Sequence, residues 1–179
     1  MKLAQCIILD LLKDYDPVPI LPETCDFHFS GVQLLDQDNP TDDPSILYIG
    51  TTTQISSFDT EKLKDFCIIC IGKKEDVSSY IENYQANLIL IPENHSLASV
   101  VNTLYTGFHR ILRWDAELQN AILSKQNYQS LFSIGGRFFG KNAMLMVNSS
   151  YNVIGTNLLE APGHEKLDFI LKNGYYSKD

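Results

Sequence analysis

Short apolar runs alternate with polar stretches and helical spacing along the first half of the chain. Residues 45–49, 66–71 and 88–91 are almost entirely apolar, and Gly50, Gly72 and Pro92 end these runs. Such runs predict strands buried on both faces, as in parallel sheets covered by helices. Apolar residues at helical spacing predict helices at 3–15 and 76–84, and a further strand is expected within 27–35. Residues 1–95 are therefore expected to form an α/β domain, with a small parallel sheet and flanking helices.

The ends of these strands predict a ligand site. In open α/β sheets, ligands bind beyond the carboxyl ends of the strands. Three polar segments lie there: Gly50, Thr51, Thr52 and Thr53, then Gly72 and Lys73, then Glu93, Asn94 and His95. Alternatively, the glycines only end strands, the threonines cap a helix and His95 is solvated. Neither G-x-x-x-x-G-K-[ST] nor G-x-G-x-x-G occurs, so no phosphate-binding motif is supported and no cofactor is expected.

The centre of the chain predicts one long helix. From Ser96 to about residue 132 there is no proline, and Gly107 is the only glycine. Such a helix would span roughly 50 Å and extend beyond its own sheet. Its apolar stripe follows heptad spacing through Val100, Leu104, Gly107, Ile111, Trp114, Leu118, Ala121, Lys125, Tyr128 and Phe132. We expect a homodimer through Leu104, Ile111, Trp114 and Leu118, in preference to packing within the chain.

The tail predicts an incomplete second domain. Residues 143–147 and 151–154 read as a hairpin, and 165–171 read as a helix. A hairpin with one helix is too little for a stable sheet domain, so we expect it to pack on a neighbour or to begin a longer domain. The predicted organisation is a sensory domain at 1–95, a linking and dimerisation helix at 96–134, and a partial domain at 135–179.

Charge and cysteines narrow the function classes. The net charge is −8, and residues 1–96 carry −10 while residues 97–179 carry +2. Nucleic-acid binding usually needs a basic surplus, so we expect no direct DNA contact by this portion. Cys67 and Cys70 have C-x-x-C spacing, but on a strand they would face opposite sides, so no metal site is expected. No signal peptide or membrane-spanning run is seen, which predicts a cytoplasmic protein.

An ordered series of short motifs resembles a known family. The motifs are Leu47-Tyr48-Ile49-Gly50-Thr51-Thr52, Phe108, Arg110-Ile111-Leu112-Arg113-Trp114, Leu118, Leu131-Phe132, Phe139-Gly140-Lys141-Asn142-Ala143, Val147-Asn148-Ser149-Ser150-Tyr151-Asn152-Val153-Ile154-Gly155 and Gly174-Tyr175-Tyr176-Ser177. In order, they resemble the amino-terminal half of PucR/CdaR-type bacterial transcriptional regulators. The resemblance implies an α/β region, a long helix and the start of a GAF/PAS-like segment, with the DNA-binding segment absent here.

Three functions are open from the sequence. The leading interpretation is a non-catalytic region that senses a small-molecule effector and dimerises. The alternative is a small α/β enzyme or nucleotide-binding protein, but the chain's histidines fit no catalytic or metal-binding motif and no catalytic residue is assigned. The third is an assembly domain without a ligand. A ligand that raises the melting temperature would distinguish the first from the third.

Overall fold

The computed structural model describes residues 2–20, 27–36, 43–57, 66–78, 81, 87–139 and 144–176. The chain forms two compact units, Met1–His109 (unit 1) and Arg110–Asp179 (unit 2). The boundary falls inside helix α5 (Leu97–Leu123), which belongs to both units. No described helix is long and apolar enough to cross a membrane.

Unit 1 is built on a five-stranded sheet in the order β2-β7-β6-β5-β4. Strands β4 (Gly31–Leu34), β5 (Ile46–Thr51), β6 (Cys67–Ile71) and β7 (Asn87–Ile91) are parallel. The edge strand β2 (Val18–Ile20) pairs antiparallel with β7. Every residue of β6 and β7 is buried, as their apolar sequences predict. The predicted α/β class, with a small mainly parallel sheet and flanking helices, is confirmed.

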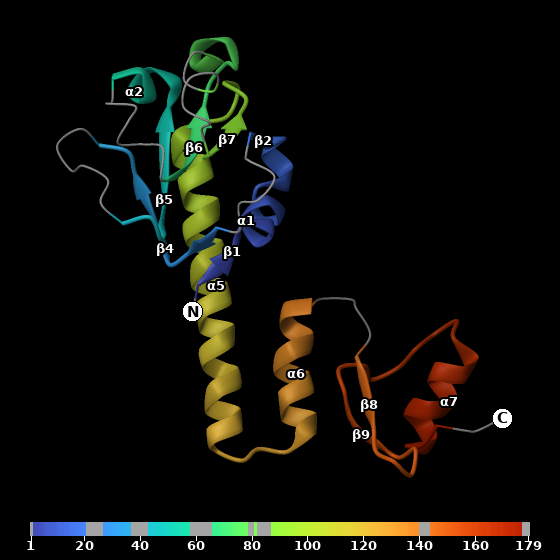
Figure 1. Ribbon diagram of the computed structural model, residues 1–179. Coiled ribbons are helices and arrows are strands. Elements are labelled where there is room, and N and C mark those ends of the chain that lie inside the picture. The colour runs from blue at the N-terminus through green and yellow to red at the C-terminus, as the bar shows by residue number, and fades with distance from the viewer. Residues whose placement is uncertain are drawn as a thin grey trace. The chain divides into compact units, whose positions relative to one another are not determined.

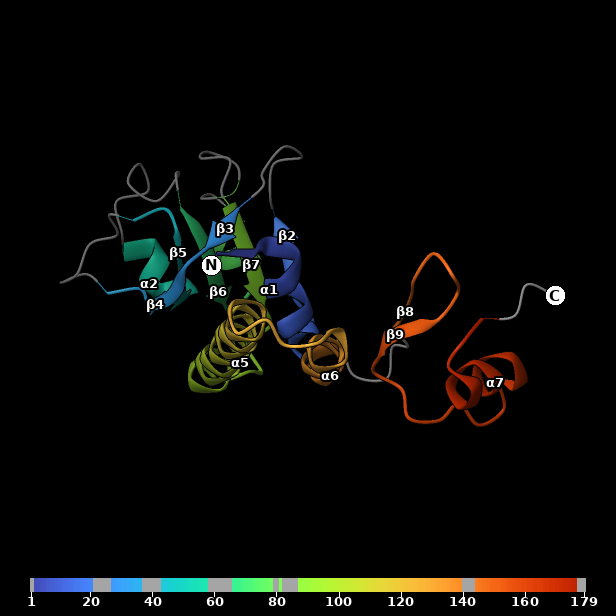
Figure 2. The same cartoon turned by 90° about the horizontal axis from the view of Figure 1, so that it is seen from below.

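Helices cover both faces of this sheet. On one face, helix α2 (Thr52–Ser57) and the short helix η2 (Glu75–Val77) cover a buried cluster. This cluster comprises Leu35, Tyr48, Ile55, Phe66, Ile68, Cys70, Val77, Leu88 and Leu90. The first part of α5 lies against the sheet with α1 (Gln5–Leu11) beside it (Figures 1 and 2). The central strands β5, β6 and β7 therefore bury both of their side-chain rows, one against each helical layer, whereas the edge strands β2 and β4 stay partly exposed.

The expected helix at 3–15 is divided among three elements. Strand β1 (Leu3–Ala4) comes first and pairs with β3 (His28–Phe29) in a small separate sheet. Helix α1 follows, and the short helix η1 (Lys13–Tyr15) continues from it. The helix predicted at 76–84 begins as η2, and residues 79, 80 and 82–84 lie outside the described part.

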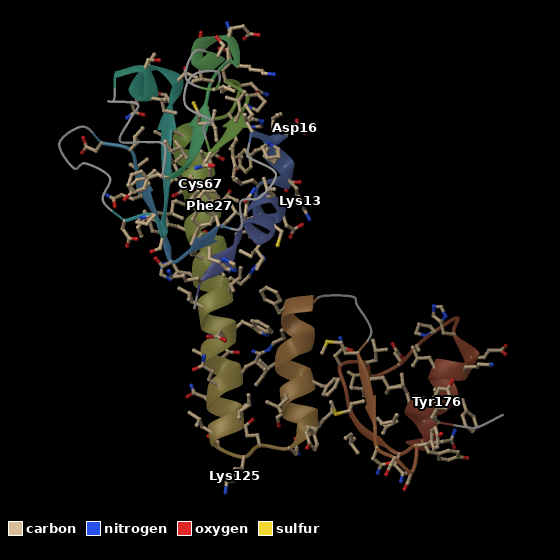
Figure 3. All side chains as sticks on the ribbon, in the orientation of Figure 1. Lys13, Asp16, Phe27, Cys67, Lys125 and Tyr176 are labelled. Carbon is tan, nitrogen blue, oxygen red and sulfur yellow. The ribbon has the colours of Figure 1, made fainter. Side chains whose placement is uncertain are left out.

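The prediction of one continuous helix through residue 132 is wrong. Helix α5 ends at Leu123, and α6 (Tyr128–Phe139) follows after a tight turn. Lys125 lies in this turn with φ of 51°, and the Gln126 amide donates to the Ala121 carbonyl at 3.0 Å. A left-handed residue with such a bond ends a helix without glycine or proline. The side chain of Lys125 projects away from the two helices (Figure 3).

Helix α6 packs against the part of α5 that lies in unit 2. In unit 2, the Trp114 ring stacks on Phe138 with ring centroids 4.4 Å apart, and its Nε1 donates to the Ile134 carbonyl at 3.2 Å. Glu117 accepts from Arg113 at 3.2 Å and from Arg137 at 2.7 Å. The part of α5 in unit 2 therefore has its partner within the same chain.

The rest of unit 2 is a hairpin and a final helix. Strands β8 (Leu145–Val147) and β9 (Val153–Thr156) pair antiparallel, as the sequence predicts. Helix α6 lies between α5 and this hairpin, and α7 (Glu165–Asn173) lies beyond it (Figures 1 and 2). Gly135 and Gly136 lie inside α6, where added side chains would meet Met144 and Asn157. Small residues let the helix approach the hairpin closely.

The left-handed conformation of Lys125 generates a stability prediction. Lys125→Gly should raise the free energy of unfolding by about 1 kcal/mol, because glycine adopts this conformation without steric cost. Gln119→Gly, inside α5, should lower it by about 1 kcal/mol. Urea denaturation followed by circular dichroism measures both changes. A destabilised Lys125→Gly variant would show that this turn does not set the end of α5.

Candidate functional site

The loops that follow β5, β6 and β7 meet at the carboxyl edge of the parallel strands. The first loop is short, because α2 starts at Thr52 immediately after β5. The Thr51 hydroxyl lies 2.9 Å from the Thr53 hydroxyl and accepts from the Gln54 amide at 3.4 Å. The Gln54 side chain accepts from the Thr51 amide at 2.9 Å and donates to the Leu35 carbonyl at 3.2 Å. Thr51 thus caps α2, which agrees with the alternative interpretation that the threonines only cap a helix. Gln54 also bonds the chain that follows β4, and so links this cap to the neighbouring strand.

The ends of β5 and β6 are in direct contact. Thr52 is buried, and its hydroxyl donates to Asp76 Oδ2 at 3.4 Å. Gly72 has φ of 152°, and a Cβ on it would lie 2.3 Å from Cγ2 of Thr52. The Gly72 amide donates to the Ile91 carbonyl at 3.0 Å, which also ties this turn to the end of β7. Glycine is therefore required at position 72 because the Thr52 side chain lies so close, and not only because the strand ends there.

An ion pair joins the ends of β6 and β7. Lys73 Nζ lies 3.4 Å from Glu93 Oε1, and both side chains are more than half exposed. Exposed pairs of this kind are worth at most about 1 kcal/mol, so an incoming charged group can replace either partner. Asn94 is exposed in the same loop.

His95 and Gly50 are placed differently from the other predicted residues. The His95 ring packs edge-on against Tyr15, with centroids 5.0 Å apart. The Tyr15 hydroxyl lies 2.8 Å from the Ser99 hydroxyl and 2.7 Å from that of Thr103. His95 therefore belongs to the contact between η1 and the start of α5. Gly50 is buried within β5, so it positions the strand end and does not line its surface.

Asp76 and Cys70 are site residues that the sequence analysis did not select. Burial, with a smaller contribution from Asp76, raises the pKa of the Cys70 thiol from 9.0 to about 12. Cys70 belongs to the cluster under α2 and η2, whereas Cys67 lies on the opposite face of β6 (Figure 3). The opposite faces of the two cysteines follow from their spacing on a strand, and Cys70 is a free thiol. Asp76 could have been found as the acidic residue that follows Gly72 by one turn.

The residues expected at a dimer interface lie mostly inside the protomer. Leu104 and Ile111 are fully buried, and Trp114 and Leu118 are half-buried. Trp114 is engaged by α6 as described above. The heptad stripe therefore serves packing within the chain along most of α5, and homodimerisation remains a prediction.

Among the described residues, no group of three or more His, Cys, Asp and Glu side chains could hold a metal ion. The chemistry that this edge offers is thus hydroxyl, amine and carboxylate groups for hydrogen bonds and ion pairs. With this geometry established, the chain was compared with known proteins: no protein family, curated protein or solved structure matches it.

The contact between Gly72 and Thr52 can be tested by substitution. Gly72→Ala should lower the free energy of unfolding by more than about 1 kcal/mol, since it adds both backbone strain and a clash. Gly163→Ala is a matched control, because its φ of 85° brings strain while no atom lies within 4 Å of the added Cβ. The loss at Gly72 should exceed that of the control, and it should shrink in a Thr52→Ala background. An equal loss in both backgrounds would contradict the contact.

The environment of Cys70 predicts its reactivity. Because thiolates and not thiols are alkylated, iodoacetamide at about pH 8 should leave Cys70 unmodified in the folded protein. Cys6 is exposed and should react. In urea, both cysteines should be modified. Mass spectrometry of the peptides measures this, and comparable labelling of Cys70 and Cys6 in the folded protein would overturn the assignment.

Proposed function

We propose that this chain is the effector-sensing region of a bacterial transcriptional regulator of the PucR/CdaR type. A small polar effector would bind at the carboxyl edge of the sheet, among Thr53, Lys73, Glu93 and Asn94. Two observations support the proposal: the mixed α/β architecture that the resemblance implies, and the convergence of three strand ends at one polar edge.

The observation that carries the proposal is the course of α5. This helix begins six residues after the end of β7, immediately beyond the loop that contains Glu93 and Asn94, and runs without a break to Leu123 in unit 2. A displacement at its first turn therefore passes along one continuous element into the second unit. Such a connection suits a protein that converts binding at one place into a change at another.

Contacts from η1 and α1 hold the start of α5. Tyr15 bonds Ser99 and Thr103 in its first two turns, and Leu11 packs against Gly107, where an added Cβ would come within 2.6 Å of it. Because the His95 ring packs on Tyr15, the loop after β7 and the start of α5 share one contact group. An effector that moves this loop would thereby change how α5 is held.

The proposed mechanism is a population shift. An effector carrying a negative charge would compete with Glu93 for Lys73, and one carrying a positive charge would compete with Lys73 for Glu93. Either would favour the arrangement of the loop in which the ion pair is open. The shift can be no larger than the difference in affinity for the two arrangements.

The single tryptophan allows a direct test, because Trp114 lies in unit 2 and the proposed site lies in unit 1. A panel of carboxylates, phosphate esters, amino acids and nucleobases is screened for compounds that raise the melting temperature. A binding compound should also change the Trp114 emission. For a negatively charged compound, Lys73→Gln should weaken binding by about tenfold, because one charged contact is lost. For a positively charged compound the same variant should tighten binding, because it frees Glu93.

Lys74→Gln is the matched control, since Lys74 is the neighbouring exposed lysine and forms no ion pair with a described residue. It should leave binding and emission unchanged. Equal weakening of binding by both variants would show that the net charge of the protein, and not a contact with Lys73, causes the effect. Binding without any change in Trp114 emission would contradict transmission through α5, and a panel with no binding compound would favour an assembly domain.

A further inference from the structure

One edge of the sheet in unit 2 is open. Within the described residues, β8 pairs with β9 and with no other strand. A two-stranded sheet is below the number of strands that is normally stable by itself. The open edge is formed by Leu145, Met146 and Val147, of which Met146 and Val147 are each 38% exposed.

The direction of the backbone groups follows from the hydrogen bonds around the hairpin. Thr156 directs its N–H and C=O away from β8, because both bond to the Gln129 side chain, at 3.1 and 2.7 Å. Leu145 is the partner of Thr156 and so directs its own groups away from β9. The Asn148 amide donates to the Asn152 carbonyl at 2.9 Å, so Val147, one residue earlier, also faces outward.

The far edge of β9 is closed by contrast. Gln129 occupies it at Thr156, and the chain near the C-terminus occupies the rest. There, the Val153 amide donates to the Gly174 carbonyl at 2.8 Å and the Tyr176 amide to the Tyr151 carbonyl at 2.7 Å. Tyr176 lies at this end of unit 2 (Figure 3). The hairpin therefore offers backbone donors and acceptors on the β8 side.

The sequence of β8 lacks the usual protection of an edge strand. Exposed edges are commonly blocked by charge, proline or a bulge. Residues 144–147 are Met-Leu-Met-Val, without charge or proline. The irregularity in this hairpin places an extra residue, Ile154, in β9 and leaves β8 regular.

We propose that the β8 edge pairs with the β8 edge of a second copy of this chain. The register follows from the outward groups: Leu145 would exchange two hydrogen bonds with Val147 of the partner copy, and the two-fold axis would pass between the two Met146 residues. Since these residues carry no charge, two copies can approach without like-charge repulsion. The product is a four-stranded antiparallel sheet, with the same surface used by both copies.

This inference rests on the geometry of unit 2 and not on the proposed sensing function. It places the homodimer contact on a strand edge that no described residue of unit 2 pairs with, whereas the heptad stripe of α5 is mostly buried. A protein that dimerises through β8 but binds no effector would support the inference and contradict the proposed function. A monomer that senses an effector would do the reverse.

Sedimentation of the full chain over a range of concentrations tests the proposal. The wild type should be a dimer, and Val147→Lys should weaken association by more than about tenfold, because it places two lysines in one joined sheet. Leu159→Lys is the matched control: Leu159 is 96% exposed in the same unit and lies outside β8, so its dimer should persist. Unchanged Trp114 emission shows that each variant is folded.

Crosslinking tests the register independently. In the proposed pairing, the two Met146 residues form a non-hydrogen-bonded pair, whose Cα atoms are about 4.5 Å apart and can carry a disulfide. Met146→Cys should therefore give a 146–146 linked dimer on mild oxidation, identified by mass spectrometry, whereas Leu159→Cys should not. A monomeric wild type, a Val147→Lys dimer as tight as the wild type, or equal crosslinking at both positions would overturn the proposal.

Discussion

The close contact between Gly107 and Leu11 fixes where α5 lies in unit 1. A side chain at Gly107 would come within 2.6 Å of the Leu11 side chain, so the helix and α1 can meet at this distance only with glycine there. The consequences extend in both directions along α5. Toward its start, Val100 and Leu104 are buried, and Tyr15 reaches the hydroxyls of Ser99 and Thr103. Toward its end, the same helix supplies Trp114 and Glu117 to unit 2. One small residue thus allows a single helix to serve two cores.

The sheet was predictable from the sequence, whereas the course of the long helix was not. Strands β6 and β7 bury both of their faces, so their sequences carry an unmistakable apolar signal, and Cys67 and Cys70 fall on opposite faces by strand geometry alone. The end of α5 has no such signal, because residues 124–127 contain neither glycine nor proline. The left-handed Lys125 and the stacking of Trp114 on Phe138 define the turn, and neither leaves a trace in local spacing. Heptad spacing looks the same in the sequence whether the helix packs on a second chain or on the next helix of its own chain.

The candidate site was predictable as a place but not as a set of contacts. The strand-end rule selects the three loops, since parallel strands end at one edge. It does not show that Gly50 is buried within its strand or that His95 packs on Tyr15, because both depend on segments distant in sequence. The contact between Asp76 and Thr52 was unpredictable for the same reason, because Thr52 lies 24 residues earlier on a different strand end. Pairings across strands are decided by tertiary packing, which a single sequence does not display.

The amide of Gln129 has a consequence for how far this protein can assemble. A sheet with both edge strands unpaired can add strands from further copies without limit, and such growth leads to fibres. In unit 2, the Gln129 side chain occupies the backbone groups of Thr156 where another strand would pair, and the segment around Tyr176 occupies the remainder of that edge. Growth of the sheet is thereby confined to one direction. In the pairing proposed above, association through the hairpin would stop at two copies, because Gln129 blocks pairing at the far edge of each hairpin.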